Sequence, residues 1–168
     1  FEFIASSGAI SDGSASVVFT SSHFDANNYR NYVFKFANVI LQSDNWGLEL
    51  RVSEDNGSTY LTGNVYKDNS AALKGYSTLN QYGIGNQAGE SGLSGDMMLY
   101  NPHETSAYTQ YRTLFMNVTG SGDLARENGI RNDLHWIQNS SSINNIKIYP
   151  ANGNFRSGYI DMYGIKKS

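Results

Sequence analysis

The feature of this chain that most limits its fold is a repeated alternation of apolar and polar residues with a period of two. Aromatic residues occupy every second position of Tyr32–Ala37, and aliphatic residues do the same in Leu48–Ser53. Successive side chains of a β-strand point to opposite faces, so this period predicts strands that bury one face. No long stretch keeps a helical period, and a short helical turn is expected only at Asp123–Ile130. The chain is therefore predicted to be all-β with little helix.

The same pattern predicts further strands, at Ala15–Thr20, Asn64–Lys67, Leu73–Leu79, Asp96–Tyr100, Tyr108–Val118, Leu134–Gln138, Ile143–Tyr149 and Tyr159–Ile165. Gly- and Ser-rich turns separate them, which is typical of sandwiches and barrels. Eight to ten strands must cover their edges, and two packed antiparallel sheets achieve this. We expect a single domain over residues 1–168, a two-sheet antiparallel β-sandwich of jelly-roll or lectin-like type. Because the chain opens at Phe1, we interpret it as a fragment or the ordered part of a longer protein.

Two local patterns make finer predictions about pairing and burial. Asn56-Gly57 follows the strand Leu48–Ser53 and has the signature of a hairpin turn. We therefore expect the hairpin to continue through Tyr60 and Leu61. In the strand Leu134–Gln138, Trp136 alternates with Leu134, which predicts that Trp136 faces the core.

Composition excludes several classes of protein. The net charge is −3 and the 12 Lys and Arg residues are scattered, so no basic stripe for nucleic acid is present. No apolar run approaches the roughly 20 residues of a membrane span, which argues against membrane insertion. The chain has no Cys, and disulfides and Cys-zinc sites are therefore ruled out. A protein assembled inside the cell or a virion component fits a cysteine-free chain, and many secreted proteins lack cysteine too.

No catalytic or metal-binding motif stands out. The chain has three His, at His23, His103 and His135, and it lacks a Gly-x-Ser-x-Gly elbow. Acidic residues do not form the paired carboxylates of a glycosidase. Oxygen-rich Asp25–Asn28 and Glu54–Asn56 would suit Ca²⁺, but ordinary turns use the same residues. We expect no enzyme activity, no metal and no cofactor.

Aromatic residues near turns are the best candidates for a ligand site. Trp46 follows Asp44 and Asn45 in a turn between two strands, where the ring would cover a sugar face and the polar groups would bind hydroxyls. We predict a glycan site at these three residues, completed by Asp55 and Asn56. The alternative is that Trp46 fills a hydrophobic corner. Tyrosines near turns would also suit an adhesive surface: Tyr60, Tyr76, Tyr82, Tyr100 and Tyr108.

Several motifs resemble a domain of marine phage structural and tail-fibre-type proteins. They are Tyr32–Val39, Val52–Tyr60, Met98–Pro102, Ile143–Pro150, Gly153–Phe155 and Gly158–Ile165. The resemblance covers nearly the whole chain and implies a lectin-like sandwich used as a fibre tip, decoration or baseplate module. It brings no catalytic motif to transfer.

Three functions follow from these observations. The first is a non-enzymatic virion module for structure or adhesion, such as a tail-fibre, receptor-binding or capsid-decoration domain. It would form a homo-oligomer, as a trimer, bind other virion proteins and attach to host surface polysaccharide. The second is a carbohydrate-binding module of an enzyme, and the third is a polysaccharide depolymerase.

Overall fold

The computed structural model describes residues 1–67, 73–79, 83–86, 92–118 and 129–167. Within these ranges the chain forms twelve strands and one 3₁₀ turn, η1 (Ser21–His23). The strands are β1 (Glu2–Ser6), β2 (Val17–Phe19), β3 (Tyr29–Leu41), β4 (Leu48–Ser53), β5 (Tyr66–Lys67), β6 (Leu73–Lys74), β7 (Ser77–Thr78), β8 (Gly92–Tyr100), β9 (Thr109–Val118), β10 (Gly129–Ile137), β11 (Asn145–Pro150) and β12 (Phe155–Lys166). The prediction of an all-β chain with little helix is confirmed.

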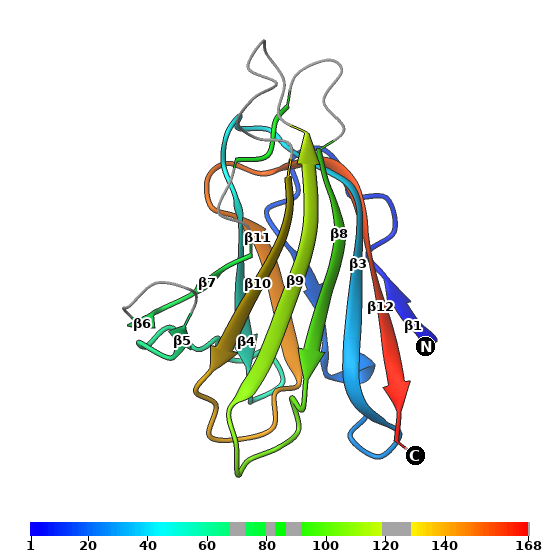
Figure 1. Ribbon diagram of the computed structural model, residues 1–168, viewed down its shortest axis with the longest axis vertical. Coiled ribbons are helices and arrows are strands. Elements are labelled where there is room, and N and C mark those ends of the chain that lie inside the picture. Colours follow the sequence, from blue (N-terminus) through cyan, green and yellow to red (C-terminus); the bar gives the residue numbers. More distant parts are fainter. Residues whose placement is uncertain (68–72, 80–82, 87–91, 119–128, 168) are drawn as a thin grey trace.

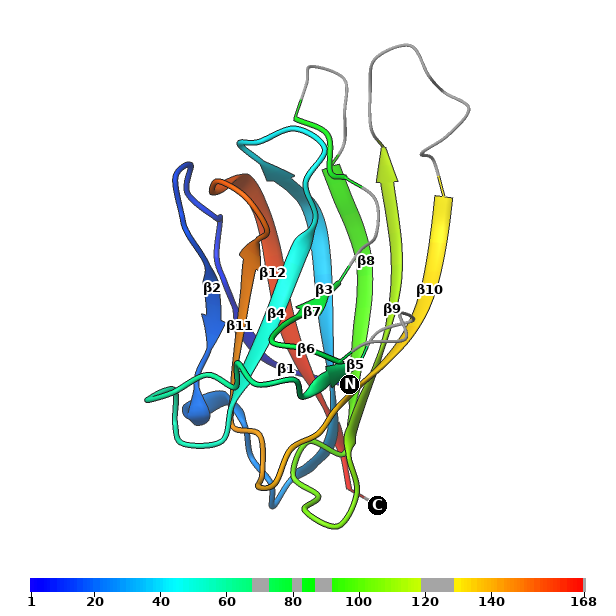
Figure 2. The same cartoon turned by 90° about the vertical axis from the view of Figure 1, so that its left-hand side faces the viewer.

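The strands form two antiparallel sheets that pack face to face. The large sheet has the order β1-β12-β3-β8-β9-β10-β5-β6, and the small sheet has the order β2-β11-β4-β7. Figure 1 views the large sheet from outside, and Figure 2 shows β2, β11 and β4 on one side of the molecule and β8, β9 and β10 on the other. The predicted two-sheet antiparallel sandwich is confirmed, whereas a jelly-roll chain order stays a prediction.

Consecutive strands often lie in different sheets. The chain passes from the large to the small sheet between β3 and β4 and again between β10 and β11, and it returns between β11 and β12. Among the strands in the described ranges, β8, β9 and β10 form the longest run of neighbours in both sequence and space, and β5 and β6 form a shorter one. Turns therefore gather at the two ends of the sandwich, where segments distant in sequence meet (Figure 1).

The period-two residues fill the core between the sheets. Tyr32, Phe34 and Phe36 of β3 are buried, and they face the buried aliphatic residues of β4. The rings of Phe19 in the small sheet and Phe34 in the large sheet meet edge to face, with centroids 5.2 Å apart. Aromatic pairs of this geometry stabilise a fold beyond the area they bury. The alternation thus places one face of each strand against the opposite sheet.

The predicted hairpin after β4 is only half correct. Asn56 (φ 61°) and Gly57 (φ 83°) are both left-handed, as the Asn-Gly turn requires. Beyond the turn, the Leu61 N–H donates to the Val52 carbonyl (2.9 Å), but no strand forms beside β4 there, and the next strand, β5, pairs with β10. The buried Tyr66 hydroxyl takes the place of the second main-chain bond, because it accepts from the Val52 N–H (2.9 Å) and donates to the Leu61 carbonyl (3.1 Å). Strand β4 pairs instead with β11 and β7.

Two other predicted segments and one unpredicted strand complete the comparison with the sequence. The segment Leu73–Leu79 is split, because β6 joins the large sheet and β7 the small one. The helical turn at Asp123–Ile130 falls mainly on residues outside the described ranges, and its last two residues belong to β10. Strand β1 was not predicted, since its five residues are exposed or half-buried and carry no alternation.

The prediction that Trp136 faces the core was wrong. His135 and Ile137 are the buried residues of this part of β10, and Leu134 is 67% exposed. The His135 ring stacks on the Tyr111 ring of β9 with centroids 4.5 Å apart. Alternation identifies residues that share a face but not which face is buried, and a shift of one residue exchanges the two sets.

Candidate functional site

The structure separates the two turns that were predicted to form one glycan site. Asp44, Asn45 and Trp46 precede β4, whereas Asp55 and Asn56 follow it. The six residues of β4 span about 17–20 Å at roughly 3.3 Å per residue. The two turns therefore lie at opposite ends of the sandwich (Figure 1), and the expectation of a shared site was wrong.

The carboxylate of Asp55 is used within its own turn. It accepts hydrogen bonds from the Ser53 hydroxyl (2.6 Å), the Thr59 N–H (2.8 Å) and the Thr59 hydroxyl (2.5 Å). These bonds, the Ser53 hydroxyl first, lower the pKa of Asp55 to about 2. A carboxylate saturated in this way shapes the turn and has little capacity left for a ligand.

Neighbouring groups tie the same turn to the loop between β10 and β11. The Glu54 carboxylate accepts from the N–H groups of Ser140 (2.6 Å) and Ser141 (2.8 Å). Asn144 accepts from the Asn56 N–H (3.0 Å) and donates to the Glu54 carbonyl (3.2 Å). Asp55 and Asn56 thus belong to a structural network that joins two loops.

The turn before β4 leaves Trp46 accessible. The indole is 46% exposed, and Asn45 beside it is exposed and left-handed (φ 60°). The Asn45 amide donates to the Asp44 carboxylate at 3.3 Å. Main-chain bonds hold the turn, from the Asn45 N–H to the Ile84 carbonyl (3.2 Å) and from the Ile84 N–H to the Trp46 carbonyl (2.8 Å). An exposed ring beside an amide and a carboxylate keeps the composition of a sugar contact.

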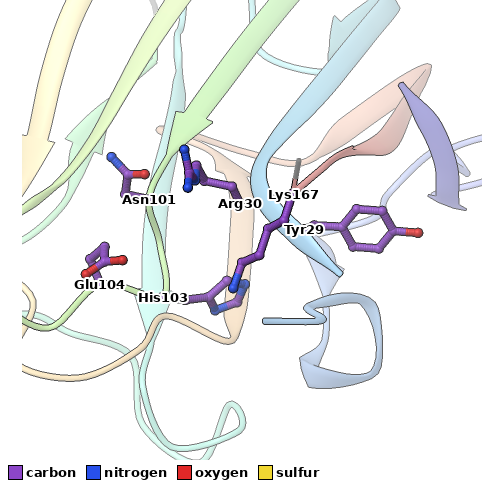
Figure 3. Close-up of a pocket in the computed structure, with 6 residues that line it drawn as sticks. All are labelled: Tyr29, Arg30, Asn101, His103, Glu104 and Lys167. Carbon is purple, nitrogen blue, oxygen red and sulfur yellow. The ribbon is translucent and has the colours of Figure 1, made fainter. Parts of the chain in front are cut away.

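A small pocket of about 140 Å³ lies at the end of the sandwich where β3 begins and β8 finishes. Figure 3 shows its six lining side chains, with the Lys167 amine directed toward the His103 side and Tyr29 turned away. The His103 ring uses both nitrogens, Nε2 with the Tyr32 hydroxyl and Nδ1 with the Ser142 hydroxyl, each at 2.9 Å. Burial, followed by the charge of Lys167, lowers the pKa of His103. This imidazole cross-links β3 to the loop after β10.

The outer face of the large sheet carries exposed apolar side chains beside charged ones, which include the Lys35–Asp96 ion pair (3.2 Å). Leu114 and Met116 of β9 are 38% and 54% exposed, and Phe3 of β1 and Tyr159 of β12 lie on the same face. We call these four residues the apolar patch. A hollow of about 180 Å³ adjoins it, lined by Phe1, Val33, Lys35, Asp96, Met98, Arg112 and Leu114.

A second group of aromatic side chains lies on this face, toward the end where β9 begins. The Tyr108 and Trp136 rings stack, with centroids 5.2 Å apart and planes 5° from parallel. Tyr100 and Tyr108 were among the tyrosines expected to suit an adhesive surface, whereas Trp136 was assigned to the core. Of the other tyrosines in that group, Tyr82 lies outside the described residues.

The outer face of the small sheet has a different character. Charged residues alternate with the buried ones there, and they contact tyrosine rings. The Lys147 amine lies 5.7 Å from the centroids of both Tyr60 and Tyr149, and the Arg51 guanidinium lies 5.5 Å from that of Tyr149. These cation–π contacts pair the charged side chains of this face with tyrosine rings of the same face.

Comparison with protein-family models and with curated proteins found no match to this chain. In the described part of the chain, no group of three or more His, Cys, Asp or Glu side chains is placed to hold a metal ion. The same part contains no helix that is long and apolar enough to cross a bilayer. The evidence on function therefore comes from the surfaces described above.

Proposed function

We propose that this chain is a non-enzymatic adhesion and assembly module of the virion-surface type that its sequence resembles. The observation that carries the proposal is the exposed apolar patch on the outer face of the large sheet. Exposed apolar surface of this kind marks interaction sites in soluble proteins. A jelly-roll or lectin-like chain order is part of the same proposal.

Two observations support a non-enzymatic role. His103, the histidine of the pocket in Figure 3, has both ring nitrogens in hydrogen bonds. The carboxylates of Glu54 and Asp55 accept hydrogen bonds from backbone N–H and hydroxyl groups. General acid–base catalysis needs a group that is free to exchange a proton with a substrate. The polar side chains at this end stabilise loops instead.

The proposed assembly is a homotrimer that buries the apolar patch. Light scattering at about 20 μM should give a mass three times the 18.6 kDa of one chain. The double variant Leu114→Glu/Met116→Glu should be monomeric, because burying two carboxylates in an apolar interface is costly. Val18→Glu, at a 39% exposed position of the small sheet, is the control and should remain trimeric. A monomeric wild type would contradict the assembly proposal.

A carbohydrate-binding module attached to an enzyme is the second candidate. The exposed ring of Trp46 and the stacked Tyr108–Trp136 pair favour it, since aromatic faces bind sugars. A monomer that binds polysaccharide would support this candidate over the virion module. A trimer that binds host surface polysaccharide would support the first.

A further inference from the structure

One row of outward side chains crosses three strands of the large sheet. Tyr100 of β8 pairs in register with Gln110 of β9, and Gln110 pairs with Trp136 of β10. Their neighbours Leu99, Tyr111 and Ile137 are fully buried, so these three side chains point outward. Adjacent strands are about 4.8 Å apart, which places the two aromatic residues roughly 10 Å from each other. That span accommodates two linked pyranose rings.

Tyr108 extends the row at its Trp136 end. Its ring is 52% exposed and stacks on the indole. The Gln138 amide donates to the Tyr108 hydroxyl at 3.1 Å, and the Asn139 amide oxygen accepts from the adjacent Thr109 N–H at 2.8 Å. The aromatic pair is therefore held in place before any ligand arrives. Side chains ordered in advance avoid part of the entropy cost of binding.

The polar groups beside the rings match neutral sugars. The exposed Gln110 amide can both donate and accept, and Arg112 follows it two residues later on the same face. Amides and guanidinium groups bind hydroxyls, whereas ring faces cover the C–H surface of a pyranose. Because the row crosses an open sheet face, it suits a chain that lies across it.

We propose that Tyr100, Tyr108, Gln110 and Trp136 form a binding platform for a neutral polysaccharide chain. The inference rests on the proposed adhesive function and names its ligand class and contact residues. The apolar patch carries the assembly, and this platform at the other end of β9 carries the adhesion.

Affinity gel electrophoresis with barley β-glucan, konjac glucomannan and birch xylan tests the platform, with alginate as an anionic probe. The wild type should be retarded by at least one of the three neutral polymers and not by alginate. Trp136→Ala should weaken that binding by about tenfold, the loss of one aromatic contact, and Trp136→Phe should retain part of it. Tyr60→Ala, an aromatic change on the outer face of the small sheet, should leave binding unchanged.

Melting temperature and mass, measured on the same variants, separate the outcomes. Weaker binding by Trp136→Ala with both properties unchanged supports the platform. If Trp136→Ala instead becomes monomeric, the rings are an interface between copies, and the inference fails while assembly stands. If binding depends on Trp46 and not on Trp136, adhesion stands but this platform is overturned. A wild type that binds none of the neutral polymers also overturns it.

Discussion

At the end of the sandwich where β4 finishes, side chains of Glu54, Asn139 and Asn144 join neighbouring loops. At the opposite end, where β4 begins, main-chain bonds hold the turn of Trp46, and single side-chain bonds of Gln42, Asn86 and Arg156 join the segments around it. Glu54 accepts from two N–H groups of the loop after β10 at the first end. At the second end, the turn holding Trp46 exchanges two main-chain bonds with Ile84. Main-chain bonds survive replacement of a side chain, and side-chain bonds do not. Substitutions and changes of pH at the first end should therefore lower the stability of the fold more than substitutions at the second end do.

The largest effect is expected for Asn139→Ala at the side-chain end. The Asn139 amide is buried, accepts from Thr109 N–H (2.8 Å), and donates to the carbonyls of Glu104 (3.2 Å) and Ser141 (3.0 Å). Its removal leaves three main-chain groups without this partner and should lower the free energy of unfolding by about 2–4 kcal/mol. Urea denaturation measures this change.

Asn86→Ala is the matched control at the main-chain end. The Asn86 amide makes one hydrogen bond, to the Gln42 carbonyl at 2.6 Å. The expected loss is about 1 kcal/mol or less. Equal losses for the two Asn→Ala variants would contradict the difference between the ends.

As the pH is lowered, the first loss of stability should come from His103, which lies at the end of the sandwich held by side-chain bonds. Its pKa is lowered below the ordinary 6.5, chiefly by burial, with Lys167 lowering and Asp25 raising it. The unfolded chain thus binds a proton more readily, so stability is full above pH 6.5 and falls as the pH drops toward the folded pKa. Urea midpoints between pH 8 and pH 5 should show this decline. His103→Gln should reduce the slope, and an unchanged slope would rule out His103 as its source.

A second loss is expected at lower pH through Asp55. Its pKa is about 2 in the folded chain against an ordinary value of 3.8. The stabilisation is therefore complete above pH 3.8 and disappears as the pH falls toward 2. Thermal melts between pH 5 and pH 2 check this. Asp55→Asn should be less stable than the wild type at pH 5 and approach it at pH 2.

An effect about as small as that of Asn86→Ala is expected for Trp46→Ala at the main-chain end. Because the ring is 46% exposed and main-chain bonds hold its turn, unfolding should become easier by about 1 kcal/mol. The melting temperature would fall by about 2–4 °C. Phe34→Ala in the core, expected to cost about 3–5 kcal/mol, is the reference. A loss of that size for Trp46→Ala would show that the indole fills a hydrophobic corner.

The fold class followed from the sequence because the period of two is a local signal. Aromatic residues at every second position of β3, with Lys35 between them, were enough to predict a strand and to place those aromatic residues on one face. Strand partners were not predictable in the same way, because pairing depends on distant groups. After a correctly predicted Asn-Gly turn, the Tyr66 hydroxyl bridges the Val52 N–H and the Leu61 carbonyl, so one main-chain bond in place of a strand pair joins this segment to β4.

The candidate site shows the same limit. Trp46 lies exposed in a turn, as the polar residues beside it suggested. Asp55 was predicted to bind a ligand, but its carboxylate accepts hydrogen bonds within its own turn, and the sequence does not distinguish these two uses of an Asp. Trp136 was assigned to the wrong face, since alternation alone leaves two choices of register. His135 did not indicate the correct face, because a polar residue is usually expected on the outer face of a strand.

The sheet edges carry a consequence for aggregation. Of the strands that the structure describes, β2, β6 and β7 form three of the four edges and have only two or three residues each. The fourth, β1, is interrupted by a bulge between Phe3 and Ala5, and Glu2 beside it pairs with Lys166 at 2.9 Å. Short, bulged or charged edges give little template for another chain to add a strand. At high concentration this domain should therefore form oligomers of fixed size and not fibrils that grow by strand addition.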